Sequence, residues 1–220
     1  FEVSVLVPSP GGQVGASGSD SNGKDGVKPT RTPSFTTLAN APLLPPEVDA
    51  FPSPTGVLIC ARQGPKEGET LALVSCWVGC VHMVLVRWAG EGRGTVHVAV
   101  SVASPSSLPG PDSLLVSIGM LCPPNDVDFE DNSLCCLLVS DSRHSCHIEA
   151  ASVKPCDNDE GVFELLQGPW SLANVHPASS LLVPCTHQLG GGMLCFTPNS
   201  IIAVGDQGVR GKVESPVAFT

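Results

Sequence analysis

The sequence predicts an all-β protein built from four-stranded units, and two features of its pattern carry this prediction. Short apolar runs alternate with turns rich in glycine and proline, and such runs are too short for helices but suit paired strands. The runs fall into three groups of four that repeat about every 45–60 residues, the spacing of β-propeller blades that carry loop insertions. We therefore expect about three antiparallel blades of a partial β-propeller. An immunoglobulin-like sandwich is the rival all-β architecture.

The N-terminal quarter differs in character from the rest of the chain. Residues 1–7 read as one strand, which we assign to a preceding blade. Residues 8–51 are dominated by glycine, serine and proline and contain few large apolar side chains, so they cannot bury enough surface to offset the entropy of ordering. We expect a disordered insertion there. The chain begins inside a strand-like run, which indicates a piece of a larger protein.

Residues 52–220 hold the predicted blades. The first group of strands is expected at 56–61, 70–76, 79–88 and 94–102. The second is expected at 113–121, 134–140, 145–153 and 161–166, and the third at 179–184, 192–197, 200–204 and 213–219. Loops are expected at 104–112 and 123–132. The links at 76–79, 141–144 and 198–199 are short enough for antiparallel hairpins.

Two glycine-containing motifs in the C-terminal part of the chain are predicted to form turns. Gly168, Pro169 and Trp170 are predicted to form a turn that closes one blade, since glycine and proline are the strongest turn residues. Gly190, Gly191 and Gly192 lack the lysine and hydroxyl residue of a phosphate-binding loop. We interpret this triplet as the entry to a tight hairpin where side chains would clash.

Composition limits the classes of function. With 11 basic and 21 acidic residues the formal charge is −10, which argues against direct nucleic-acid binding, because phosphate contacts need a basic surface. No run of 18 apolar residues predicts a transmembrane helix, and we expect no membrane partner. Most of the 10 cysteines lie in apolar runs, where a free thiol packs as a small hydrophobic group, and this favours a reduced intracellular protein.

The candidate chemical sites are weak. Cys76, Cys80 and His82 lack the second ligand pair of a zinc site, and Cys135 and Cys136 point to opposite faces of one strand. His144, Cys146 and His147 flank a turn, where the two imidazoles would face different ways. Asp126, Asp128, Glu130 and Asp131 lack the glycine and terminal glutamate of a calcium loop. The sequence also contains no nucleophile elbow. Because each of these candidates is incomplete, we expect no catalytic, cofactor or metal site, and we expect that the protein is not an enzyme.

Several segments together resemble a known family. GPWSLANV (168–175), a strand ending in Leu-Val-Pro, a glycine pair and NSIIAVG (199–205) resemble the first propeller of the family of damage-specific DNA-binding protein large subunits. Residues 52–86 and 134–153 resemble earlier paired strands of that propeller. The wider family includes the large subunit of cleavage and polyadenylation specificity factor and the propeller subunit of splicing factor 3b.

This resemblance implies a fold and a role. The fold would be a seven-bladed, WD40-like propeller, of which this chain supplies about three blades. The role would be that of an adaptor in a cullin-RING ubiquitin ligase, acting in DNA damage recognition, repair and protein ubiquitination in the nucleus and cytoplasm. The propeller would face the substrate receptors, and nucleic acid would be reached only indirectly through the complex. The turn at 141–144 matches a hairpin facing that cleft, so Arg143 is the expected partner contact.

Two other functions stay open. One is a scaffold subunit of an mRNA 3′-end processing or splicing complex, which the wider family also implies. The other is a secreted, disulfide-linked β-sandwich protein. Co-purifying proteins separate the first from the ligase adaptor, and a count of free thiols tests the second.

Overall fold

The protein folds into antiparallel β-sheets with no helix in the part of the chain that the structure describes. The computed structural model describes residues 1–8, 35–45, 50–64, 66–91, 95–104, 106, 108–121, 134–141, 145–156, 163–186 and 191–214. Within these residues fourteen strands form one two-stranded and three four-stranded sheets. The prediction of an all-β protein is confirmed.

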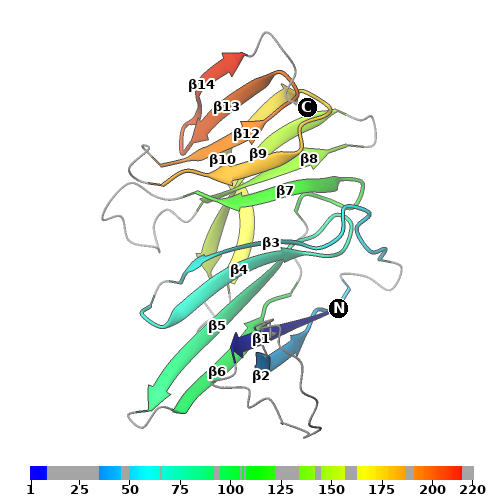
Figure 1. The fold of residues 1–220 in the computed structure, drawn as a ribbon. Helices are drawn as coiled ribbons and strands as arrows, with labels where there is room; N and C mark the ends of the chain where they lie inside the picture. The colour runs from blue at the N-terminus through cyan, green and yellow to red at the C-terminus, as the bar shows by residue number, and fades with distance from the viewer. Residues whose placement is uncertain are drawn as a thin grey trace, which may run out of the picture.

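Each four-stranded sheet is made of four strands that follow one another in the chain. Sheet I contains β3 (Leu58–Gln63), β4 (Glu69–Ser75), β5 (His82–Glu91) and β6 (Thr95–Val102). Sheet II contains β7 (Leu114–Met120), β8 (Leu134–Ser140), β9 (Cys146–Pro155) and β10 (Phe163–Val175). Sheet III contains β11 (Leu181–Pro184), β12 (Met193–Phe196), β13 (Ser200–Gly205) and β14 (Gly208–Glu214). The sheets are stacked in chain order (Figure 1).

Most predicted strands lie where the pattern places them, but the last described strand begins earlier than predicted. The pattern predicts this strand at 213–219, whereas β14 begins at Gly208 directly after a two-residue turn at Asp206 and Gln207. Residues 215–219 lie outside the described residues. Gly208 takes a φ of 100°, which lets the chain reverse immediately and pair with Gly205. An Asp-Gln pair is not a usual hairpin signal, so the sequence pattern missed this turn.

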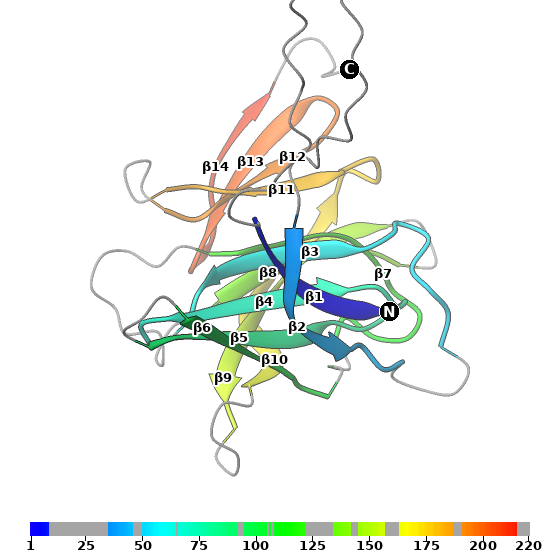
Figure 2. The same ribbon diagram turned by 60° about the horizontal axis from the view of Figure 1, so that its bottom comes forward.

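The two-stranded sheet corrects part of the prediction for residues 8–51, at Phe35–Pro42. β1 (Glu2–Pro8) confirms the N-terminal strand, and it pairs with β2 (Phe35–Pro42), which lies inside the segment predicted to be disordered. β2 has little apolar periodicity of its own, so its pairing with β1 and the packing of the pair on sheet I specify it as a strand. Figure 2 shows β1 and β2 in front of sheet I. Residues 9–34 lie outside the described part of the chain.

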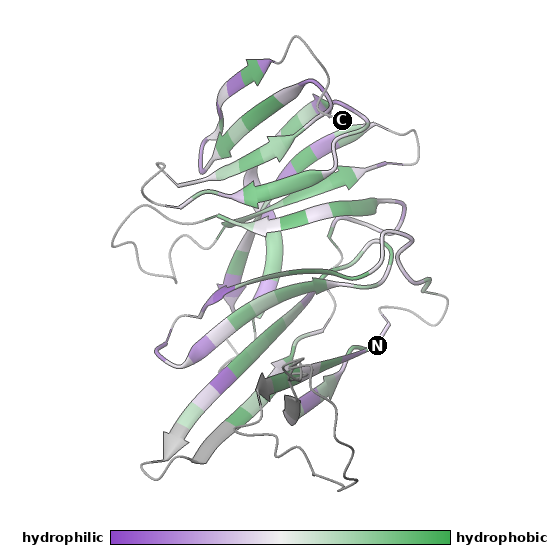
Figure 3. Ribbon diagram, viewed as in Figure 1, coloured by the Kyte–Doolittle hydropathy of each residue, from purple (hydrophilic) through white to green (hydrophobic). Residues whose placement is uncertain are grey.

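Three layers of apolar side chains hold the stacked sheets together. Figure 3 shows that the strands are rich in hydrophobic residues. The first layer joins sheets I and II, the second joins sheets II and III, and the third joins the β1–β2 pair to sheet I. β8 is buried on both faces: Cys135 and Leu137 belong to the first layer, whereas Cys136 and Leu138 belong to the second. The predicted opposite orientation of Cys135 and Cys136 is confirmed.

The first strands of the three sheets lie next to one another. β7 contacts both β3 and β11. The backbone N–H of Met120 in β7 donates to the Cys60 sulfur in β3 at 3.1 Å, and Ser117 in β7 accepts a 3.0 Å hydrogen bond from the backbone N–H of Leu182 in β11. Polar bonds and apolar packing thus join the sheets along their first strands.

The topology also places the inter-sheet links and the central hairpin turns at one end of the sheets, here called the rim. Each sheet starts and finishes there, because four antiparallel strands return the chain to its starting end, and the β4–β5, β8–β9 and β12–β13 turns lie at the same end. The contacts agree: Val78 donates to the carbonyl of Phe51 at 3.0 Å, and Cys146 donates to the carbonyl of Pro177 at 3.2 Å.

Candidate functional site

A cavity of about 490 Å³ opens on the rim between sheets II and III, and we call it the rim pocket. Its apolar lining comes from Val175, Pro177 and Ile202. Its polar lining comes from Ser145, Asn174, His176, Asn199 and Lys212, together with the hydroxyl residues Thr197 and Ser200. These residues belong to the β8–β9 turn, the end of β10, the β10–β11 link, the β12–β13 turn and strands β13 and β14.

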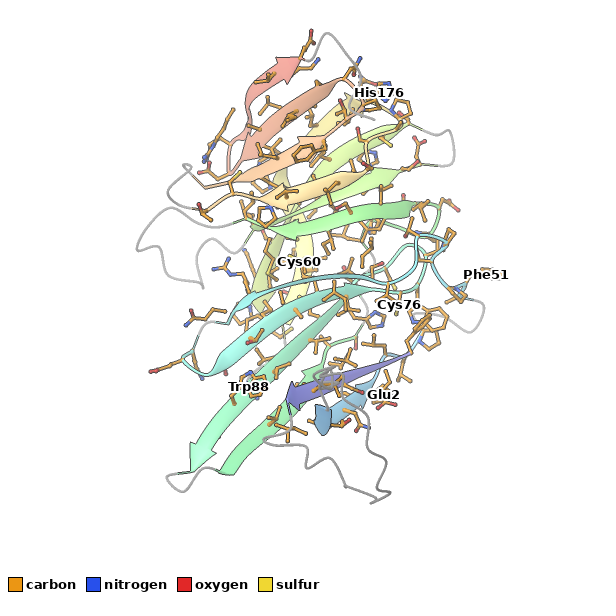
Figure 4. The ribbon with its side chains drawn as sticks, viewed as in Figure 1. Glu2, Phe51, Cys60, Cys76, Trp88 and His176 are labelled. Carbon is orange, nitrogen blue, oxygen red and sulfur yellow. The ribbon has the colours of Figure 1, made fainter. Side chains whose placement is uncertain are left out.

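The end of β10 and the β10–β11 link form one wall of the rim pocket. Asn174 has a φ of 58° and is the only non-glycine residue with a positive φ in the described part of the chain; asparagine tolerates this conformation better than most residues. The next residues form a tight turn in which the N–H and hydroxyl of Ser179 donate to the carbonyl of His176 at 2.9 and 2.6 Å. His176 lies exposed at this end of the sheets (Figure 4).

The hydrogen bond of His176 sets the tautomer of its ring. The Nδ1 atom accepts a 3.1 Å hydrogen bond from the backbone N–H of Ala178. In the neutral ring the proton is therefore on Nε2, which becomes a hydrogen-bond donor. The link itself therefore holds the ring of His176, which lines the pocket.

The β12–β13 turn forms the opposite wall. The Thr197 hydroxyl donates to the carbonyl of Ser200 at 2.9 Å and accepts the Ser200 N–H at 2.9 Å, and both side chains are buried. The hydroxyls of Thr197 and Ser200 form their hydrogen bonds within the turn, and these bonds hold the turn rigid. The exposed Asn199 side chain extends from this turn.

Lys212 supplies the cation of the pocket. It pairs with Ile202 across β13 and β14, and Ile202 belongs to the layer between sheets II and III. Its Nζ lies 2.6 Å from Oε1 of Glu214, two residues along the same edge strand. The hydrogen bond from Lys212 and its charge lower the pKa of the Glu214 carboxyl.

A second uncovered surface is the outer face of sheet III, here called the end face. Its apolar residues form two cross-strand rows, Leu181–Phe196–Ile201–Val213 and Val183–Leu194–Ala203. Leu181 and Val213 are 48% and 69% exposed, and the others are half-buried. The opposite face of the same sheet packs on sheet II.

Arg143, the predicted partner contact, lies outside the described residues. The residues that flank its turn are described: the backbone N–H of Asp141 donates to the carbonyl of Ser145 at 3.0 Å, and the Ser145 N–H donates to Oδ1 of Asp141 at 2.9 Å. Ser145 also lines the rim pocket. Ser145, the residue that follows this turn in the chain, is thus a described residue at the pocket.

The predicted turn at Gly168, Pro169 and Trp170 is wrong. These residues lie inside the long strand β10, where the register with β9 shifts between Gln167 and Ser171. Pro169 has no N–H to donate, which suits a bulge. A Cβ on Gly168 would lie 2.6 Å from the carbonyl carbon and oxygen of Ala150, so glycine is required for close approach of the strands.

The hairpin predicted at the glycine triplet is confirmed at its described residues. Gly191 and Gly192 have φ values of 67° and 90°, and a Cβ on Gly192 would lie 2.4 Å from the carbonyl oxygen of Val204. The Gly191 N–H donates to the carbonyl of Thr186 at 3.1 Å. Gly190 lies outside the described residues.

The cysteine and histidine candidates pack as core residues. Burial raises the pKa of the Cys80 thiol to about 11 and lowers the pKa of His82, whose Nε2 lies 2.8 Å from the carbonyl oxygen of Leu44. His147 contacts Glu149 at 3.0 Å on the face of β9 opposite Cys146. Among the described residues no group of three metal-ligating side chains is placed to hold an ion. His144 and the acidic cluster at 126–131 lie outside them.

No protein-family model matches the chain, and no curated protein matches it in sequence. A search of the described residues for a helix long and apolar enough to cross a membrane also finds none. The rim pocket has no signal in the sequence, because its residues are separated by up to tens of positions and only the stacking of sheets II and III brings them together.

Proposed function

We propose that this chain is a protein-interaction scaffold made of consecutive β-propeller blades. One observation carries the proposal: three meanders of four strands stack face to face in chain order, with their first strands side by side through β7. Propeller blades are four-stranded sheets arranged around a central channel, and such an arrangement brings their first strands together. The β1–β2 pair on the other face of sheet I fits a contribution to a preceding blade.

The end face supports the same proposal. Its two rows continue the pattern by which sheet I packs on sheet II and sheet II on sheet III. Covering the exposed parts of Leu181 and Val213 would contribute about 2 kcal/mol, since full burial of such a side chain is worth roughly 1.5–3 kcal/mol. A further blade would supply this cover.

Within this class we propose the substrate-receptor-facing propeller of a cullin-RING ubiquitin ligase adaptor, acting in DNA damage recognition and repair. The resemblance of residues 52–220 to the damage-specific DNA-binding protein large subunits supports this assignment. The rim offers links and turns held by a rigid sheet scaffold, which suits partner recognition. The charge of −10 suits a subunit that reaches nucleic acid only through its complex, in the nucleus and cytoplasm.

Affinity purification of the tagged full-length protein from cells, before and after ultraviolet irradiation, tests this function. We expect a cullin and substrate receptors to co-purify. Arg143→Glu should lose receptors but keep the cullin, because a rim arginine can fork onto carbonyls or carboxylates of a docked segment. Lys154→Glu, an exposed change at the opposite end of β9, is the matched control and should keep both.

Other outcomes of the purification would redirect the proposal. Recovery of polyadenylation or splicing factors without a cullin would favour the RNA-processing scaffold. Recovery from the culture medium, with few free thiols under denaturing and non-reducing conditions, would favour the secreted β-sandwich. Seven described cysteines that are free and buried or nearly so support the reduced protein: Cys76, Cys80, Cys135, Cys136, Cys146, Cys185 and Cys195.

A further inference from the structure

The rim pocket presents hydrogen-bond donors in an otherwise acidic protein. The chain has 21 acidic and 11 basic residues, yet the described residues that line this pocket include Lys212 and His176 and no aspartate or glutamate. Asn174 and Asn199 add exposed side-chain amides from opposite walls. Donors from both walls therefore share the pocket with its apolar lining residues.

The internal hydrogen bonds of the lining residues leave a ring donor of His176 unused. His176 uses Nδ1 to accept the Ala178 N–H, which leaves the Nε2 proton for another partner. The hydroxyls of Thr197 and Ser200 bond within their own turn, so they form a wall. Ser145 is fixed at its backbone by Asp141, whose Oδ1 accepts the Ser145 N–H.

In this structure the ammonium of Lys212 is paired with the carboxylate of Glu214. The two groups lie 2.6 Å apart on an exposed edge strand, with 72% of the Glu214 side chain exposed. An exposed pair of this kind is worth little, because water screens it. A carboxylate that entered the pocket could replace Glu214 on Lys212 and gain the donors of His176 and the asparagines as well.

We propose that the rim pocket binds the carboxylate of a glutamate or aspartate side chain in an extended segment of a partner protein, with Glu214 as an internal competitor for Lys212. The methylene groups of that side chain would pack on the apolar lining residues Val175, Pro177 and Ile202. This inference deepens the proposed scaffold function and rests on it, since the ligand is part of a protein. It specifies an acidic segment as the partner chemistry at the rim.

Nuclear magnetic resonance with defined peptides tests the proposal on the full 220-residue chain. The probe is a nine-residue peptide of alternating glycine and serine with a central glutamate, capped at both ends so that it carries no other carboxylate. The side-chain amide signals of Asn174 and Asn199 report binding. A peptide with central glutamine and a solution of acetate are the comparison ligands.

Two substitutions on β14 should act in opposite directions. Lys212→Met should weaken binding of the glutamate peptide about threefold, since it removes the cation, and Glu214→Gln should tighten it about threefold, since it removes the competitor. Lys154→Met, at the far end of β9, should change nothing. Both test positions lie on an exposed edge strand, so dispersed spectra check that the variants fold.

Three results would overturn the inference. Equal shifts with the glutamine peptide would show that the pocket does not distinguish a carboxylate from an amide. Equal shifts with acetate would show that it is a site for small anions. Unchanged or weaker binding in Glu214→Gln would remove the competitor role. Peptide binding without cullin co-purification would support the carboxylate site and contradict the ligase assignment. Cullin co-purification without peptide binding would contradict the carboxylate site alone.

Discussion

Replacing Gly168 by alanine tests the account of the bulge in β10. The added Cβ would lie 2.6 Å from the carbonyl carbon and oxygen of Ala150 and 2.9 Å from its Cβ. Ordinary contact needs about 3.4 Å, so β10 must move by most of an ångström. Ala150 lies on β9, which is held between β8 and β10, and it is buried, so the neighbour cannot retreat.

The expected cost follows from this overlap. Overpacking against a fixed neighbour costs about 1–3 kcal/mol, and the contact here is with backbone, so we expect about 2–3 kcal/mol of lost unfolding free energy. With a urea slope of about 2 kcal/mol per molar, the midpoint should fall by about 1 M or more. Urea titration followed by tryptophan fluorescence and circular dichroism measures the shift, because Trp170 lies two residues away.

Gly211→Ala is the matched control. Gly211 is also in a strand, β14, but a Cβ there meets nothing within 4 Å. Alanine should therefore stabilise the protein slightly, by about 0.5 kcal/mol, because glycine loses more backbone freedom on folding. If Gly168→Ala unfolds within about 0.5 kcal/mol of Gly211→Ala, the close approach of β10 to β9 is not what selects glycine.

Three further changes probe the core and the hairpins. Leu138→Ala should cost about 3 kcal/mol in urea titration, because Leu138 is fully buried between sheets II and III; a loss below 1 kcal/mol would contradict that packing. Gly192→Ala should cost at least 2 kcal/mol, since its φ of 90° and the Val204 carbonyl both exclude a Cβ, and unchanged thermal unfolding would argue against this hairpin. Burial raises the pKa of the Cys136 thiol from 9.0 to about 12. The unfolded chain therefore loses this proton at a lower pH than the folded protein does. The contribution of the thiol to the unfolding free energy is fully present below pH 9 and is lost as the pH rises toward 12. Between these values the unfolding free energy should fall by about 1.4 kcal/mol per pH unit from this thiol, and Cys136→Ala should show a shallower fall.

The strand positions were predictable because their signal is local. Alternation of side chains across β4 or β9 is written in neighbouring residues, and the glycines at 191 and 192 take positive φ values that other residues rarely adopt. The opposite faces of Cys135 and Cys136 follow from the two-residue period of any strand. No partner strand needs to be known for these inferences.

Gly168, Pro169 and Trp170 were misread because glycine and proline serve two different structures. The same residues that make a turn also suit a bulge, and the outcome depends on whether β9 continues beside them. β2 was missed for a related reason, since its partner β1 lies more than twenty residues earlier and supplies the order that its own sequence lacks.

The sequence by itself determined the all-β class, the spacing of the strands and the burial of the cysteines, because each depends on the period of apolar residues over a few positions. The tertiary structure alone decided how the sheets stack, which face of sheet III stays uncovered, and that Asn174, His176, Asn199 and Lys212 surround one cavity. Those features depend on contacts between residues far apart in the chain, and a single sequence carries no local pattern for them.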